Sequence, residues 1–215
     1  MTSKEFVQEL RDTVGAFCRT LDSQPPAYSY VPLKTDAERL RVMKSRLFNE
    51  LRAADLFGGW LKTTPELEVK AMMARSAHEE TVHAELLAAR IRELGAEPFD
   101  YRPLPAQMSM FNALEGLTDS CQRVAGFSMG GEGVANYLIE KALAAPSVPD
   151  WIKAPYRKIL ADEVGHGSAP EEILERYATT SEHQDAARRA VAMRVVLMRE
   201  YFASLDRWAT GQAEW

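Results

Sequence analysis

The sequence predicts an all-α protein in which four long helices form a bundle and a further helix flanks the bundle at each end. Apolar residues recur every three or four positions along almost the whole chain of 215 residues, and the alternating pattern of a half-buried strand is missing. Capping boxes, in which Ser or Thr is followed three residues later by Glu or Gln, begin helical stretches at Thr2, Thr35 and Ser181. A chain of this length makes a single domain, residues 1–215.

The core bundle is expected to cover residues 35–178, and the flanking helices residues 2–22 and 181–209. Proline-rich or glycine-containing stretches separate the helical segments, as is usual where helices end. We number the core helices from first to fourth, and expect them at about residues 35–61, 65–94, 107–145 and 150–177.

A long crossover joins the second and third core helices. Residues 95–106 can extend about 40 Å when stretched, whereas the second core helix is about 46 Å long. The crossover therefore nearly spans the bundle and allows the third core helix to lie parallel to the second. Because Glu132 lies deeper in its helix than Glu80 does, we expect the third helix to overhang the bundle or to begin late.

Composition excludes several classes of partner. The net charge of -5 comes from 26 basic and 31 acidic residues spread along the chain, which gives no reason to expect a nucleic acid or an anionic membrane as partner. Cys18 and Cys121 are far apart and form no Cys-x-x-Cys pair, which fits a reducing compartment. The first residues are charged where a signal peptide is apolar, and no run reaches the ~18 apolar residues of a membrane span. We expect a soluble, cytoplasmic protein.

Two Glu-x-x-His pairs are the most informative pattern in the chain. Glu80 pairs with His83, and Glu163 pairs with His166. Residues three apart lie on one face of a helix, so each pair presents a carboxylate beside an imidazole. Tracing the inward face of the other two core helices in steps of three and four gives seams that are apolar or small except at Glu50 and at Glu132.

Each core helix thus places one glutamate near the middle of the bundle. Burying four carboxylates is costly, because each loses its hydration and like charges repel. Two divalent cations would balance the four negative charges, and two imidazoles would complete the set of ligands. The predicted metal ligands are Glu50, Glu80, His83, Glu132, Glu163 and His166.

This arrangement resembles the di-iron carboxylate proteins of the ferritin-like superfamily, and the resemblance covers about residues 35–178. It implies a ferritin-like four-helix bundle that holds two iron ions, with mixed manganese–iron or two manganese ions as the alternative. The oxygenase and oxidase branch implies an enzyme that activates dioxygen to oxidise a small organic substrate. We further expect a homodimer and an electron-donor protein as partner.

The resemblance also suggests residues that support the ligands. In the oxygenase branch, the residue before each Glu-x-x-His often orients a ligand histidine. By that analogy Asp162 would orient His83 and Glu79 would orient His166, although Glu79 is equally well explained as a solvated surface acid.

Two further polar residues lie within one or two turns of predicted ligands. Asn136 follows Glu132 by one turn, where some di-iron oxygenases place a polar residue, and Tyr156 precedes Glu163. Both also fit as ordinary core residues.

Four glycines surround Glu132, and each costs about 1 kcal/mol relative to alanine inside a helix. One explanation is close packing between helices. The other, which we favour, is a cavity beside the metals for dioxygen or substrate, accompanied by a π-bulge. The glycines are Gly126, Gly130, Gly131 and Gly133.

Other functions of the same bundle remain open. An iron-oxidising or peroxide-detoxifying protein would resemble the bacterioferritins or the rubrerythrins. However, Thr81 stands where bacterioferritin has its haem-binding Met, and Ala135 stands where rubrerythrins often add a glutamate. A manganese catalase-like enzyme would use similar ligands. A metal-free helical interaction protein would leave the buried acids unexplained.

Overall fold

The computed structural model describes residues 1–165 and 168–212, and it contains helices and no strand within those ranges. The prediction of an all-α fold is confirmed. None of the described helices is at once long enough and apolar enough to cross a membrane. The helices are α1 (Ser3–Thr20), a 3₁₀ turn η1 (Ala27–Ser29), α2 (Asp36–Trp60), α3 (Leu67–Glu93), α4 (Pro105–Glu115), α5 (Ser120–Arg123), a π-helix η2 (Val124–Glu132), α6 (Gly133–Ala144), α7 (Asp150–Gly165), α8 (Ala169–Tyr177) and α9 (Ser181–Ala209).

Capping boxes fix the first residues of α1 and α2. At the start of α2, the Thr35 hydroxyl accepts a hydrogen bond from the backbone N–H of Glu38 at 3.2 Å, and the Glu38 carboxylate accepts one from the Thr35 N–H at 3.0 Å. The same reciprocal pair begins α1 at Thr2. The box predicted at Ser181 is wrong by one residue, because Thr180 caps α9 and Ser181 is already helical.

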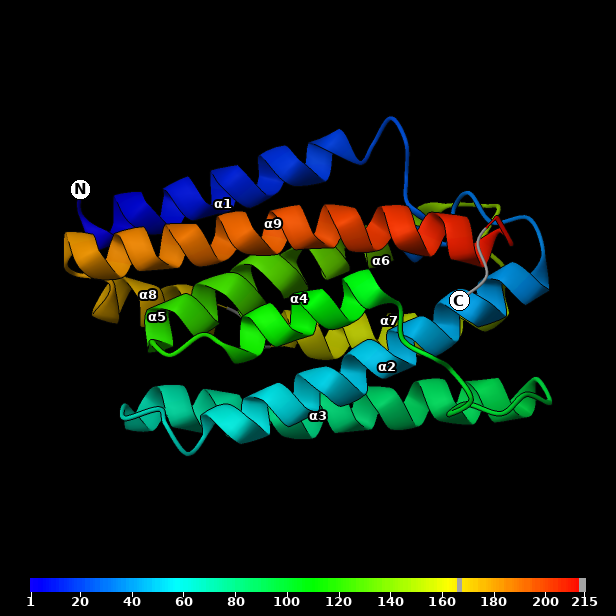
Figure 1. Cartoon of the computed structure of the whole chain (residues 1–215), viewed down its shortest axis with the longest axis horizontal. Coiled ribbons are helices and arrows are strands. Elements are labelled where there is room, and N and C mark those ends of the chain that lie inside the picture. The colour runs from blue at the N-terminus through cyan, green and yellow to red at the C-terminus, as the bar shows by residue number, and fades with distance from the viewer. Residues whose placement is uncertain (166–167, 213–215) are drawn as a thin grey trace.

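The first two core helices, α2 and α3, form an antiparallel hairpin and pack along each other (Figure 1). The third core helix, predicted as one segment over residues 107–145, is in fact divided. Its first part is the separate helix α4, which runs back across the bundle as part of the crossover (Figure 1). After a break, the Asp119 carboxylate accepts hydrogen bonds from the N–H groups of Cys121 and Gln122, and this cap starts the third core helix at Ser120. The expected late start is therefore confirmed.

The middle of the third core helix is a π-helix, in which the N–H of Gly133 bonds to the carbonyl of Ser128 five residues earlier. Its glycines lie against α9. A Cβ atom on Gly126 would lie 3.2 Å from the Cβ of Ala190, and one on Gly130 would lie 3.4 Å from Cγ of Arg194. Close packing therefore explains Gly126 and Gly130, whereas Gly131 and Gly133 each line a cavity next to Glu132, as the favoured explanation predicts.

The C-terminal helix α9 lies between α1 and the π-helix along the length of the molecule (Figure 1). A buried polar network joins it to α2 and α4. The side-chain amide of Gln107 donates to Asn49 Oδ1 at 2.7 Å and to the Ser45 carbonyl at 3.1 Å. The hydroxyls of Ser45 and Tyr201 are 2.9 Å apart. This network fixes the crossover and α9 beside the middle of α2, where Glu50 lies.

Candidate metal centre

The ring of His83 on α3 lies inside the bundle, 1% exposed, with carboxylates of three helices around it. Its Nδ1 atom lies 3.9 Å from Glu50 of α2, 3.8 Å from Glu80 of α3 and 3.8 Å from Glu163 of α7. One ligand atom each of Glu50, Glu80 and His83 lies within 4.8 Å of the others. The structure thus brings together four of the six predicted ligands around one nitrogen atom.

Helical spacing explains how these side chains meet. Glu80 and His83 are three residues apart, so α3 presents both on the face that packs against α2 and α7. Glu50 lies near the middle of α2 and is largely buried, with 11% of its side chain exposed. Glu163 is equally enclosed, at 9%. Carboxylates from different helices are therefore held out of bulk water.

This concentration of negative charge is unfavourable without compensation. Burial, followed by the charge of Glu50 and then those of Glu132 and Glu163, raises the pKa of Glu80 well above its usual range. Each of the three neighbours thus favours the neutral form of Glu80. A cation between them would remove this cost.

Both ring nitrogens of His83 are buried and have no hydrogen-bond partner among the described residues. Leaving such a group unpaired costs about 1–3 kcal/mol. The Nδ1 atom faces three carboxylates, and Nε2 lies 3.6 Å from Oδ2 of Asp162, too far for a good hydrogen bond. A metal ion accepts the Nδ1 lone pair and leaves Nε2–H to face Asp162, so the arrangement fits a metal ligand with an orienting carboxylate.

The separations also suit a shared ion. Two atoms bound to one ion at about 2.1 Å lie about 3 Å apart at right angles and about 4.2 Å apart when opposite. The spacings of 3.8 and 3.9 Å around His83 Nδ1 fall between these values. Carboxylate and imidazole ligands suit iron and manganese.

The remaining predicted site residues have different surroundings. Glu132 and Asn136 line the cavity that also contains Glu50, Glu80 and Glu163. His166 lies outside the described residues, so its role as a ligand stays a prediction, and so does the pairing of His166 with the half-buried Glu79.

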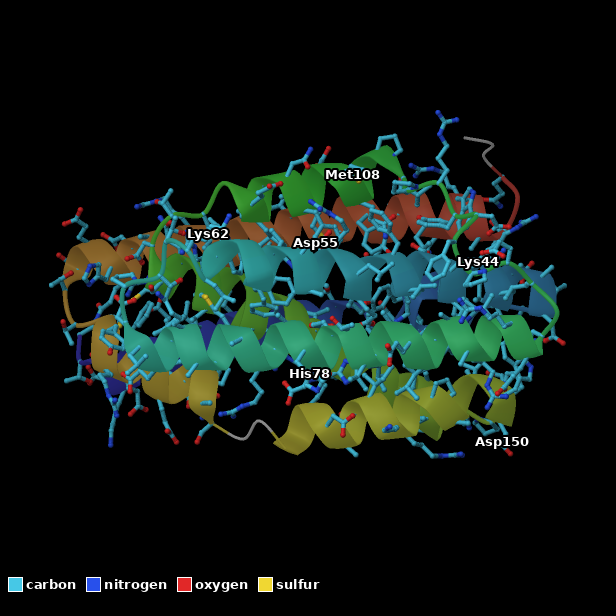
Figure 2. The ribbon with its side chains drawn as sticks, turned by 90° about the horizontal axis from the view of Figure 1, so that it is seen from below. Lys44, Asp55, Lys62, His78, Met108 and Asp150 are labelled. Atoms are coloured by element: carbon cyan, nitrogen blue, oxygen red, sulfur yellow. The ribbon has the colours of Figure 1, made fainter. Side chains whose placement is uncertain are left out.

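Tyr156 is buried but does not line that cavity. Its hydroxyl is 2.7 Å from the hydroxyl of Tyr30, and its ring faces the guanidinium of Arg46, whose Cζ lies 4.5 Å from the ring centroid. Tyr156 thus supports an arginine instead of a predicted ligand. His78, which belongs to neither pair, is exposed on the outer face of α3 (Figure 2).

A cavity of about 60 Å³ lies beside the carboxylates. One water needs about 10–15 Å³ on this measure, so the cavity holds a few waters or a small molecule. Apolar side chains of Phe111, Phe127, Ile139 and Ile159 form much of its wall. A second, more open pocket of about 250 Å³ shares Glu132, Asn136 and Glu163 with it and reaches the surface near Arg11.

Two arginines in the cavity wall were missed by the sequence reasoning. Arg46 on α2 is 2% exposed and lies between aromatic rings, with Cζ 4.1 Å from the centroid of Tyr28. Arg194 on α9 is 7% exposed, and burial lowers its pKa to about 10, so it stays charged at neutral pH. Gly131 makes room for it, since a Cβ there would lie 2.9 Å from Arg194 Nη2.

Comparison with known proteins supports the fold. The sequence matches no protein-family profile and no curated protein. A solved domain of unknown function from Shewanella denitrificans, described as having a heme oxygenase-like fold, aligns with a TM-score of 0.76 at 15% identity, over 95% of this chain and 93% of that one. A CADD-like protein of unknown function from Nostoc punctiforme aligns with a TM-score of 0.67 at 13% identity, over 95% and 98% of the two chains.

At these identities the likeness extends to the fold alone. The chain is therefore an all-helical protein similar in fold to a heme oxygenase-like domain, with a buried Glu-Glu-His group suited to a metal ion. The comparisons do not distinguish the oxygenase branch from other helical metalloproteins.

Proposed function

We propose that the protein is a non-haem di-iron oxidoreductase, an oxygenase or oxidase that uses dioxygen to oxidise a small organic substrate. The observation that carries the proposal is the buried ring of His83, which has no hydrogen-bond partner among the described residues and whose Nδ1 faces three carboxylates. Two divalent ions would neutralise the glutamates of four helices, which explains why acids are tolerated in the core.

In this proposal each group of residues has a distinct part. The metal ligands are Glu50, Glu80, His83, Glu132, Glu163 and His166. With metal bound, Asp162, whose Oδ2 lies 3.6 Å from Nε2 of His83, would accept the Nε2–H and fix the ring for binding through Nδ1. Bound iron would supply the electrons and the site for dioxygen activation. Phe111 and Phe127, with the other apolar residues of the cavity, exclude bulk water from the reacting substrate.

Other members of the same structural class would use similar ligands. A bacterioferritin-like or rubrerythrin-like protein would oxidise iron or remove peroxide, and a manganese catalase-like enzyme would hold two manganese ions. The cavity beside Glu132, with two arginines in its wall, favours an enzyme with an organic substrate. An oxygenase would also need an external electron donor, and we expect a homodimer.

Metal analysis of the purified protein tests the proposal directly. Anaerobic titration with Fe(II) should load about two ions per chain, and dioxygen should then be consumed when a reductant is supplied. His83→Gln should lose at least one ion while the helical content stays the same. The matched control is His78→Gln, because His78 is an exposed histidine on the same helix.

Each outcome decides between the alternatives. Manganese in place of iron would support the catalase-like reading, and a large shell on gel filtration would support iron storage. A protein that binds neither metal, or a His83→Gln variant that loads as much metal as the unmodified chain, would contradict the metal centre itself.

A further inference from the structure

The cavity beside the carboxylates contains two buried guanidinium groups with unused hydrogen-bond donors. Within the part of the chain that the structure describes, Nε and Nη1 of Arg194 have no hydrogen-bond partner, and neither has Nε of Arg46. Both side chains are more than nine-tenths buried, and both line the cavity. Buried donors are costly to leave unpaired. They therefore indicate a bound ligand that accepts hydrogen bonds from these arginines.

The charges of the cavity wall indicate whether the bound group is an anion or a cation. Four carboxylates and two guanidinium groups give the cavity a net charge of about -2 without metals, which two divalent cations reverse to about +2. Asp162 adds little, since its side chain is 39% exposed and is screened by water. Counted over the described residues of its wall, the loaded cavity therefore has an excess of positive charge.

We infer that the cavity binds the substrate through a carboxylate group, and that Arg194 receives this carboxylate. The inference rests on the proposed di-iron function, because the positive excess arises when the metals are bound. Arg46 on α2, which lies against the rings of Tyr28 and Tyr156, contributes a second positive charge to the cavity wall.

The shape of the site favours a small organic carboxylate. The planar fork of arginine matches the two oxygens of a carboxylate. Arg194 lies over the ring of Phe127, with Cζ 5.7 Å from its centroid, and the bare backbone of Gly131 leaves space for its guanidinium. With about 60 Å³ available and apolar walls, the cavity suits a short acyl chain better than a large or strongly hydrated anion.

The first experiment compares acids with matched amides on the unmodified, metal-loaded protein. Acetate, propionate and butyrate are titrated calorimetrically at constant ionic strength, beside acetamide, propionamide and butyramide. At least one acid should bind about 10-fold or more tightly than its amide, as expected for a charge-assisted contact. In the metal-free protein this preference should disappear. Acids and amides that bind alike to the loaded protein, or inorganic phosphate that binds more tightly than every acid, would overturn the inference.

A variant then separates Arg194 from direct binding of the acid to metal. Arg194→Gln should weaken binding of the preferred acid by about 10- to 100-fold while the metal content stays the same. Arg188→Gln is the control, because Arg188 lies on the same helix and pairs with Glu9 at the surface. Equal affinity in Arg194→Gln would show that metal ligation alone holds the acid and would overturn the role of Arg194.

Further results distinguish the carboxylate site from a purely structural role of Arg194 and from a protein that binds no metal. If Arg194 were just a counter-charge, the volume-matched Arg194→Met would lower the melting temperature and leave acid affinity unchanged. Should Arg194→Gln not fold, Arg194→Lys keeps the charge without the fork, and an unchanged affinity there would contradict the inference. A chain that loads no metal would refute the proposed function, whereas a loaded chain without acid preference would refute the carboxylate site alone.

Discussion

At the scale of single residues, acidic groups on both sides of the His83 ring favour one orientation of that ring. Nδ1 faces the carboxylates, and Nε2 faces Asp162 at 3.6 Å. A carboxylate that accepts the proton of one ring nitrogen fixes the tautomer of the histidine. It also makes the other ring nitrogen, which binds the metal, more basic. Asp162 is the residue directly before the predicted ligand Glu163, so in the proposed site α7 would supply both a ligand and the support for a ligand on α3.

Asp162→Asn should therefore weaken metal binding without removing a ligand. Loss of such a supporting carboxylate typically costs about 10- to 100-fold in metal affinity, and competition against a chelator of known affinity measures it. Asp150→Asn is the matched control, since Asp150 lies at the exposed start of the same helix. Equal metal affinity in Asp162→Asn and Asp150→Asn would show that Asp162 does not support His83.

The residues of the cavity differ in how far the sequence revealed them. Glu50 and Glu132 were found because a single acid in an otherwise apolar seam is conspicuous. Arg46 and Arg194 were missed because arginine is mostly exposed, and nothing local to either shows which helix covers it. The apolar run Val195–Met198 that follows Arg194 is typical of a helix covered on more than one side, and this was the available signal.

At the scale of elements, the π-helix and α9 depend on each other. The glycines of the π-helix remove side chains where α9 approaches, and this brings Arg194 into the cavity wall. A π-helix is less stable than an α-helix and is found mostly at functional sites. Here the π-helix ends at Glu132, a predicted ligand whose side chain lines the cavity.

Gly126→Ala tests this packing. Alanine favours a helix by about 1 kcal/mol, but its Cβ would lie 3.2 Å from the Cβ of Ala190 and 3.3 Å from Leu117. We expect a net loss of about 1–2 kcal/mol of unfolding free energy, measured by chemical denaturation. Gly59→Ala on α2 meets nothing within 4 Å and should gain about 0.5–1 kcal/mol. A gain of similar size in Gly126→Ala would contradict close packing.

Helix starts were predictable at the capping boxes of Thr2 and Thr35, and the predicted start of α9 was wrong by one residue. The division of the third core helix was not foreseen, although Gly116 and Asp119 are a helix end and an N-cap in the structure. Apolar spacing continues through that break, because α4 and the third core helix each bury one face. Periodicity alone therefore joins segments that point in different directions.

At the scale of the whole molecule, the site depends on contacts between distant parts of the chain. Helix α9 follows all the predicted ligands in sequence, yet it packs against the π-helix and brings Arg194 beside them. Such packing could not be derived from the sequence, since spacing shows that a helix face is covered but not by what. The metal centre should consequently stabilise the whole fold and not just its own helices.

Glu80→Gln should have opposite effects in the two states of the protein. Without metal it removes one of the four carboxylates that line the cavity, so the variant should be about 1–3 kcal/mol more stable than the unmodified chain, with a melting temperature higher by about 2–4 °C per kcal/mol. With Fe(II) at about 1,000 times its dissociation constant, the unmodified chain should gain about 4 kcal/mol, and the variant should gain much less. Anaerobic calorimetry measures all four melting temperatures.

The control is Glu85→Gln, at an exposed position of the same helix, which should leave the melting temperature unchanged both with and without metal. If Glu80→Gln instead destabilised the metal-free protein, Glu80 would be a structural hydrogen-bonding group, and its burial would no longer argue for a bound cation.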